Sequence, residues 1–255
     1  MTNENELKVK DRDIVVPGEL LSDGTSYIPS KGIYKKDNKL YAERLGLIRI
    51  EKNLIKLVPL TGRYFPKEND KIIGKVIDVL ISGWRLDINT AYSAVLPLKD
   101  ATSEFIARGA DLTKYFNLND YVIAKITKVT SQNLIDLSMR GPGLRKLRCG
   151  RIIQVKPAKV PRIIGKDASM IKLIKDSTGC DLQVGQNGLV WINGEPEQEV
   201  IAVNTIRKIE KEAHTDGLTE SIEAFLKGAK KWNEQNTKKE LTEETGKTWD
   251  QWAQK

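Results

Sequence analysis

Histidine and cysteine are scarce in this 255-residue chain, and their scarcity excludes several kinds of site. His214 is the only histidine, and the two cysteines, Cys149 and Cys180, lie far apart and outside any CxxC spacing. A disulfide framework and a zinc site therefore both lack the ligands they need. The sequence also has no Walker loop, no GxGxxG pattern and no nucleophile elbow.

Long apolar runs are missing as well. No segment approaches the ~18 consecutive apolar residues that span a bilayer, and the N-terminal sequence MTNENELKVK has no apolar stretch typical of a secretory signal. We therefore expect a cytoplasmic protein. The chain is 40% hydrophobic, which at this length is enough to build a core in each of two or three small domains.

Acidic residues do not form an obvious catalytic set. A metal-dependent nuclease needs carboxylates that converge on divalent ions, but the acid clusters fall in the N-terminal segment, at the start of an expected helix and near the C-terminal end (Asp11, Asp13; Glu195, Glu197, Glu199; Glu243, Glu244). Acids at a helix start are favoured by the helix dipole without any metal. We expect no intrinsic catalysis, no catalytic residues, no metal site and no cofactor.

Positive charge is concentrated in one stretch. Between Arg140 and Lys175 a single acid, Asp167, stands against eleven basic residues: Arg140, Arg145, Lys146, Arg148, Arg151, Lys156, Lys159, Arg162, Lys166, Lys172 and Lys175. This stretch carries +10, whereas the whole chain carries only +8. A one-signed excess interleaved with apolar strand residues favours a polyanion-binding surface over a solvated face.

The first two modules are expected to be β-rich. Residues 1–66 contain short apolar strands (IVVPGELLSDG, LYAERLGLIRIEKN, LIKLVPLTG) separated by Gly and Pro turns. Residues 67–141 contain five strands, with a short helix expected near Asp111–Phe116 before the fourth, which is typical of a five-stranded oligonucleotide-binding (OB) barrel. The run GKVIDVLISGWRLDI and the closing LIDLSMR resemble an S1-type RNA-binding domain.

The third module, residues 145–228, changes to a pattern of strand, helix, strand, strand, helix. It resembles a divergent KH domain. At the position of the KH phosphate-binding GxxG loop the chain has Gly165-Lys166-Asp167-Ala168, so the second glycine is an alanine and an acid enters the loop. Gly185-Gln186-Asn187-Gly188 is predicted to be a hairpin turn. Residues 229–255 are expected to be a charged, helical and partly disordered tail.

The order of these modules resembles one family. A VVPGE segment (Val15, Val16, Pro17, Gly18, Glu19), an S1-type barrel and a KH domain with a GxNG turn together look like the RNA-binding cap subunit of the archaeal exosome. The resemblance spans about residues 10 to 225. It implies that the VVPGE segment docks on a hexameric ring of phosphorolytic RNase subunits, with three cap copies per ring.

The barrel departs from the usual S1 pattern. Ser82, Trp84 and Arg85 occupy the stretch where S1 domains place aromatic rings, and Pro97 takes the place of the usual histidine. Base stacking is worth ~1–3 kcal/mol per base, so the loss of these rings weakens that face. Trp84 is expected in the core, and Arg85 is the better candidate for an RNA contact.

The sequence thus predicts a multi-domain, mainly β protein with an α+β module, acting as a non-catalytic cap subunit that binds single-stranded, A-rich RNA 3′ ends and guides them into the ring. The predicted RNA-binding residues are Arg85, Arg145, Lys146, Arg148, Arg151, Lys156, Lys159, Arg162 and Lys166. Two alternatives stay open: a free-standing RNA-binding factor of translation or transcription termination, and a self-sufficient nuclease.

Overall fold

A computed structural model describes residues 7–24, 26–30, 32–102, 106, 109–213 and 217–228. The chain separates into two compact units. The first takes the chain up to Arg63 together with Lys156–Ala158, and the second takes Tyr64–Val155 and the chain from Lys159 onward. The expected tail at 229–255 lies outside the described residues, so the expectation of a helical, partly disordered tail stays a prediction.

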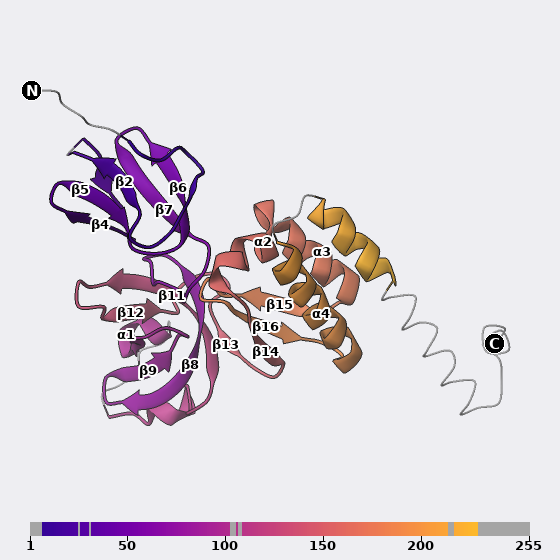
Figure 1. Cartoon of the computed structure of the whole chain (residues 1–255). Coiled ribbons are helices and arrows are strands. Elements are labelled where there is room, and N and C mark those ends of the chain that lie inside the picture. The colour runs from indigo at the N-terminus through magenta and orange to yellow at the C-terminus, as the bar shows by residue number, and fades with distance from the viewer. Residues whose placement is uncertain are drawn as a thin grey trace, which may run out of the picture. The chain divides into compact units, whose positions relative to one another are not determined.

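Two small sheets form the first unit, which we call the β module (Figure 1). One sheet has the strand order β1 (Ile14–Val15), β6 (Gly46–Glu51), β7 (Leu54–Pro59) and β3 (Ile28–Pro29); the other has the order β2 (Leu20–Asp23), β5 (Lys39–Ala42) and β4 (Ile33–Lys36). Alternate residues of these strands point inward and pack into one core, which includes the buried Leu21, Leu40, Ile48 and Ile55.

Strands β8 to β13 build the barrel of the second unit. Their bounds are β8 (Lys71–Leu80), β9 (Gly83–Asp87), β10 (Ser93–Pro97), β11 (Tyr121–Val129), β12 (Ile135–Ser138) and β13 (Lys146–Leu147). The strand order is β12-β10-β9-β8-β11-β13, and pairing of β12 with β11 closes the sheet on itself. The expected OB-like barrel is confirmed. The sequence placed Lys146 and Leu147 in the third module, but they pair with β11 as a short additional strand.

Trp84 lies at the centre of the barrel core, as expected. Its side chain is fully buried, its indole Nε1 donates to the Phe116 carbonyl oxygen at 3.0 Å, and its ring meets the Phe116 ring edge-on at 5.0 Å between centroids. The short helix expected near residues 111–116 is a 3-10 turn, η1 (Leu112–Lys114), capped by the Asp111 carboxylate. A four-residue helix that the sequence analysis missed, α1 (Leu98–Ala101), follows β10 directly.

The rest of the second unit is an αβ module that begins at β14. Its three-stranded sheet has the order β14 (Arg151–Gln154), β16 (Leu189–Asn193) and β15 (Asp181–Val184). Its turns and helices are α2 (Val160–Ile164), η3 (Lys166–Ala168), α3 (Ser169–Thr178), α4 (Pro196–Glu212) and a helix over 218–228, and the turn η2 (Pro157–Lys159), of which Pro157 and Ala158 belong to the first unit, precedes α2. Where the sequence predicted one helix between the first two strands, the structure has two, α2 and α3, separated by the loop that Gly165 opens.

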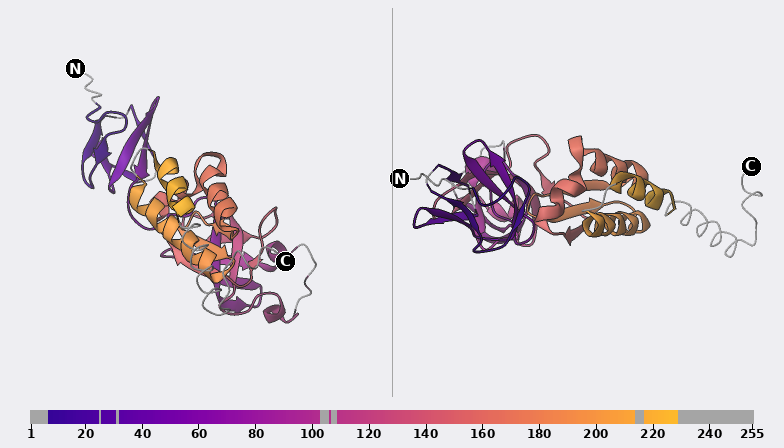
Figure 2. Two further views of the ribbon diagram at one scale, coloured as in Figure 1. Left: turned by 90° about the vertical axis from the view of Figure 1, so that its right-hand side faces the viewer. Right: turned by 45° about the horizontal axis from the view of Figure 1, so that its top comes forward.

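The helices of the αβ module pack on one face of its sheet (Figure 1). Val190 and Ile192 of β16 contribute to the same buried cluster as Ile174 of α3 and Ile206 of α4. The helix over 218–228, drawn in orange to yellow in Figure 2, adds Leu218, Ile222 and Leu226 to this core. Apolar residues at three- to four-residue spacing therefore produce the expected buried helix faces.

The opposite face of this sheet packs against the barrel. Trp191 points away from its neighbours Val190 and Ile192, because successive side chains of a strand alternate between faces, and it packs with Ile73, Ile123 and Leu147. We call this contact the seam. The barrel and the αβ module thus share an apolar cluster inside one compact unit.

Asn187 forms hydrogen bonds across the seam. It is fully buried at the tip of the β15–β16 turn, where its amide Nδ2 donates to the Ile73 carbonyl at 2.7 Å and to the Ile88 carbonyl at 2.9 Å, and its Oδ1 accepts from the Ile73 amide at 3.3 Å. Gly185 permits this approach, because a Cβ there would lie 2.3 Å from Asn187 Oδ1 and 2.8 Å from the Ile73 nitrogen. The expected turn is present, but it is buried in the seam and does not form an exposed loop.

Candidate nucleic-acid interface

The basic stretch divides into residues that are paired with acids and residues that are not. It runs from the end of β12 through β13, β14 and α2 to α3. Paired members meet carboxylates that come from distant parts of the chain, and pairing reduces the charge that they offer to a polyanion. The distinction decides which of the predicted contacts form a free positive surface.

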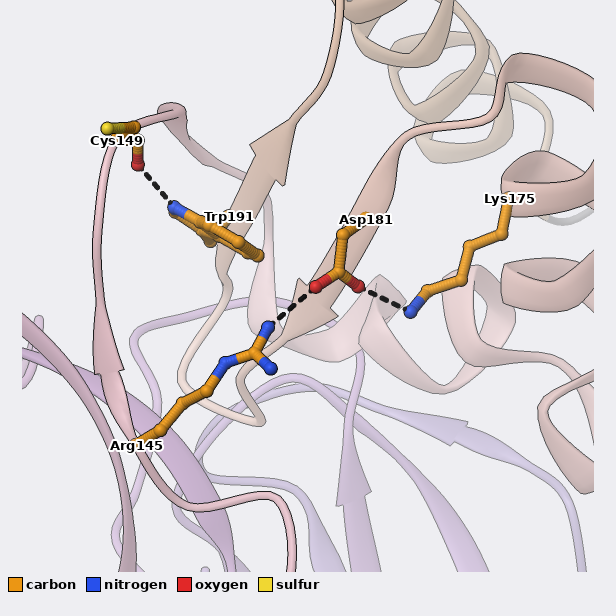
Figure 3. A network of polar contacts seen from close by, with 5 residues as sticks. All are labelled: Arg145, Cys149, Lys175, Asp181 and Trp191. Carbon is orange, nitrogen blue, oxygen red and sulfur yellow. Dashed lines mark hydrogen bonds and ion pairs between the residues drawn. The ribbon is translucent and has the colours of Figure 1, made fainter.

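Arg145 belongs to the seam (Figure 3). Its guanidinium Nη2 lies 2.6 Å from Asp181 Oδ2 on β15 and 5.7 Å from the centre of the Trp191 ring, while Lys175 Nζ of α3 lies 2.7 Å from Asp181 Oδ1. The Trp191 indole donates in turn to the Cys149 carbonyl at 2.8 Å. Arg145 therefore joins the segment before β13 to the αβ module, a structural role in addition to its predicted RNA contact.

The Asp181 carboxylate forms ion pairs with both cations of this network, Arg145 and Lys175. Burial alone would raise the pKa of Asp181, but hydrogen bonds from Lys175 and Arg145, together with their charges, lower its pKa below the ordinary value. A carboxylate that accepts charge-assisted hydrogen bonds from two cations stays ionised at neutral pH.

Lys146 and Arg151 are paired as well. The Lys146 ammonium contacts the Asp120 carboxylate at the start of β11, and Arg151 Nε lies 3.8 Å from Glu199 Oε2 on α4. The structure thus places Arg145, Lys146 and Arg151 in ion pairs, and their predicted contact with RNA stays a prediction. Their acidic partners are 26 to 48 residues away in sequence, so charge counting along the chain does not reveal them.

A second group surrounds α2 and the following loop. Arg162 lies in the last turn of α2, Lys166 follows Gly165 directly, and Lys159 precedes the helix. Arg162 and Lys166 are exposed, Lys159 is half-buried, and none of the three has an acidic partner among the described residues. Arg148 is likewise exposed and without one, and Lys156 is exposed. Arg148, Lys159, Arg162 and Lys166 therefore retain their positive field.

The loop after α2 has an unusual backbone. Gly165 has φ 74°, and Asp167 and Ala168 both lie in the left-handed region, with φ 52° and 61°. Gly165 is needed for space as well as for conformation, because a Cβ there would lie 2.8 Å from the Met170 nitrogen. Ala168 stands where a second glycine would relieve strain, since non-glycine residues visit this region at a cost.

Arg85 lies on the exposed face of β9, next to the buried Trp84. Its Nη1 is 3.8 Å from Asp78 Oδ2, and both side chains are about half exposed. A pair of this kind contributes little energy and opens easily. Arg85 therefore remains available for a phosphate, whereas Trp84 offers no surface for base stacking.

The predicted docking segment is a tight turn at the edge of the β module. Val16 N donates to the Glu19 carboxylate at 2.8 Å, and Gly18 has φ 85°. Val16 is 54% exposed, whereas Val15 is fully buried in the core of this module. The structure thus corrects the expectation for Val15, which holds the turn in place from inside; Val16, Pro17 and Gly18 are exposed and Glu19 is half-buried.

The residues that the sequence analysis missed are structural and lie at the seam. Asn187 was predicted as a turn residue, and Trp191 and Asp181 were not singled out. An Asn-Gly pair between two strands indicates a turn, but neither burial nor the carbonyls of Ile73 and Ile88 can be read from it. Among the described residues, no group of three or more His, Cys, Asp or Glu side chains is placed to hold a metal ion. In the same part of the chain, no helix is long and apolar enough to cross a membrane.

The sequence of this chain matches known protein families. Residues 12–61 match the family model described as the exosome RNA-binding protein RRP4 N-terminal domain, and residues 150–212 match the KH domain model. The chain is 41% identical over 221 residues to exosome complex component Rrp4 of Methanothermus fervidus, which covers 86% of this chain and 97% of that protein.

Further relatives agree. The Rrp4 component of Picrophilus torridus is 44% identical over 84% of this chain and 92% of its own length, and that of Thermococcus kodakarensis is 40% identical over 86% of both. A crystal structure assigned as an exosome complex RNA-binding protein matches 68% of this chain and 99% of its own, with 33% identity and a TM-score of 0.61. The chain thus belongs to the Rrp4 family of exosome complex components.

Proposed function

We propose that this chain is a non-catalytic cap subunit that binds single-stranded, A-rich RNA 3′ ends and guides them into a hexameric ring of phosphorolytic RNase subunits, three copies to a ring. The observation that supports it most directly is the cluster of unpaired cations around α2 and its loop, in a KH domain of an Rrp4 family member. Chemistry on the RNA is supplied by the ring.

The unpaired cations suit a flexible polyanion. Lys159, Arg162 and Lys166 surround a loop whose single acid, Asp167, is exposed, and guanidinium and ammonium groups form strong hydrogen bonds with phosphate oxygens. Contacts of this type depend on charge and carry little sequence information. They therefore fit a subunit that must accept many different RNA ends.

Docking on the ring is assigned to the outer face of the β1-β6-β7-β3 sheet. Ile14, Leu47 and Val58 stand side by side across three strands, since Ile14 pairs with Leu47 and Leu47 with Val58. Ile14 is 64% and Val58 45% exposed, and the exposed Val16 follows Ile14 on the next outward position. A contiguous apolar row of this kind is typical of a protein–protein contact.

The test is the salt dependence of RNA binding. Replacing Arg148, Lys159, Arg162 and Lys166 by Gln should weaken oligo(A) binding and flatten the log–log salt slope by up to about 3, because each phosphate contact on a single strand contributes ~0.7. The slope is measured by fluorescence anisotropy between low and moderate salt.

The control carries the same chemical change elsewhere. Lys114, Lys211 and Lys227 are exposed and form no salt bridge within 4.0 Å among the described residues, so a variant with these three lysines replaced by Gln should keep most of the wild-type slope. Equal flattening in both variants would contradict a localised interface. Degradation of RNA by the purified chain in the presence of phosphate and magnesium would contradict the non-catalytic assignment.

A further inference from the structure

We propose that the outer face of the β4–β5 hairpin in the β module is a second contact for single-stranded RNA, at which a base stacks on Tyr34. This inference rests on the proposed RNA-binding function and adds a site to it. The feature that suggests it is a pair of tyrosines, Tyr34 on β4 and Tyr41 on β5, whose rings stack with 5.5 Å between centroids and 20° between planes.

The hairpin presents this pair at the edge of a sheet. β4 is the outermost strand in the order β2-β5-β4 (Figure 1), and Tyr34 pairs directly with Tyr41 in the antiparallel register. The two central residues of the connecting turn, Asp37 and Asn38, both have positive φ (49° and 60°), as a type I′ turn requires. The two strands and their two-residue turn therefore form a regular β-hairpin.

Tyr34 is the more exposed ring of the stacked pair. Tyr41 is half-buried between β4 and β2, whereas Tyr34 is 43% exposed. A large aromatic side chain on an edge strand with this exposure is available to a planar ligand. Stacking on an already oriented ring costs little additional ordering, because Tyr41 restricts the Tyr34 side chain from the other side.

Positive charge lies on the same face of the hairpin. Lys36 and Lys39 are paired in register, two residues further along β4 and β5 than the tyrosines. Lys39 forms an ion pair with Asp23 at 2.7 Å, whereas Lys36 is exposed and has no acidic partner among the described residues. An aromatic ring beside a free ammonium offers one partner to a base and one to its phosphate.

A single-stranded nucleic acid fits this face better than the alternatives. Every base has a π-face, so stacking on Tyr34 requires no particular sequence. The bases of a duplex are stacked on each other and unavailable, and a purely apolar protein partner would leave Lys36 without a counter-charge. Trp84 of β9 is fully buried and offers no face to a base, whereas Tyr34 lies exposed on an edge strand of the β module.

The experiment measures binding of a 20-nucleotide oligo(A) to the full chain by anisotropy, with wild type, Tyr34→Ala and Tyr34→Phe. Tyr34→Ala should bind about five- to 150-fold more weakly, the range that corresponds to removal of one base–aromatic stack. Tyr34→Phe keeps the ring and should bind as wild type. Tyr92→Ala removes an equally exposed tyrosine (46%) from a barrel loop and should leave binding unchanged.

A second measurement does not depend on a folded variant. RNA carrying 4-thiouridine is irradiated with the wild-type chain, and mass spectrometry should locate an adduct on the peptide that contains Tyr34. Wild-type affinity in Tyr34→Ala, or no adduct in the β module, would show that Tyr34 and Tyr41 only pack against each other and overturns the inference. Failure of the wild-type chain to bind oligo(A) at all overturns the proposed function itself.

Discussion

Ala168 holds a backbone conformation that alanine ordinarily avoids. Its φ of 61° and ψ of 24° lie in the left-handed region, which costs an L-residue roughly 1–2 kcal/mol. Replacing Ala168 by Gly should raise the free energy of unfolding by up to about 1 kcal/mol, because part of the relief is offset by the greater freedom of glycine in the unfolded chain. Urea unfolding followed by circular dichroism measures the change.

The matched control places the same substitution in an ordinary helix. Ala202 is buried in the middle of α4, where a glycine should lower the free energy of unfolding by about 1 kcal/mol. Opposite signs at the two positions are expected. Destabilisation by Ala168→Gly would mean that the alanine methyl makes contacts that outweigh the strain.

The position of a site residue can be predicted from sequence only when its contacts come from residues nearby in the chain. Trp84 was expected in the core because a strand tryptophan usually packs inward, and the structure confirms it. Val15 was expected at a docking surface, but its inward position depends on its register with Gly46 of β6. The same limit applies to Arg145, whose partner Asp181 is 36 residues away. The sequence shows where basic residues are concentrated, but it does not show which acidic residues will pair with them in the fold.

At the scale of elements, the network around Asp181 ties α3, β15 and the segment before β13 together. The pKa of Asp181 lies below its ordinary value of 3.8, so the folded state favours the ionised form. Its contribution to stability is complete at neutral pH and disappears as the pH falls through about 4 and below. Replacing Asp181 by Asn should therefore flatten the acid side of the stability profile.

Asp176 provides the comparison for this change. It is exposed near the end of α3 and has no basic partner among the described residues, so Asp176→Asn should keep the wild-type pH dependence. The measurement is the free energy of unfolding in urea at several pH values from 7 down to 3. Because Asp181 is partly exposed (38%), the loss at neutral pH should stay below about 1 kcal/mol. A parallel shift at all pH values would contradict the assignment.

Long elements were predictable, whereas one-turn helices and two-residue strands were not. Alternating apolar residues predict β8 and β11, and the spacing of apolar residues predicts α4, because these segments are long enough to show a period. Helices α1 and α2 have four and five residues, about one turn, which is too short for a 3.6-residue pattern to appear. The two-residue strands β1, β3 and β13 exist through their partners in the sheet, so pairing defines them and local propensity does not.

At the scale of the whole molecule, the seam should make the barrel and the αβ module unfold together. Asn187→Asp keeps the shape of the side chain but loses both donors to the Ile73 and Ile88 carbonyls. Each buried carbonyl left without a donor costs about 1–3 kcal/mol. In wild type, amides of β8 and β16 should exchange hydrogen with the same free energy of opening, and in the variant β16 should open first.

Asn204→Asp is the control for this prediction, because Asn204 is exposed on α4. It should leave the exchange of both strands nearly unchanged. Native-state hydrogen exchange read by NMR or mass spectrometry separates the two outcomes. If β8 and β16 still open together in Asn187→Asp, the apolar contacts of Trp191 alone couple the two parts.

The hydrogen bonds of Asn187 to the barrel backbone limit which domains of this chain can be exchanged. One amide satisfies two carbonyls and one N–H of the barrel backbone, and the turn that carries it requires Gly185 at close approach. A barrel or a KH domain taken from another protein would lack the groups that form these hydrogen bonds. For engineering, the barrel and the αβ module from Tyr64 onward should therefore be exchanged together. A graft that exchanges only one of them must recreate the hydrogen bonds between Asn187 and the barrel backbone.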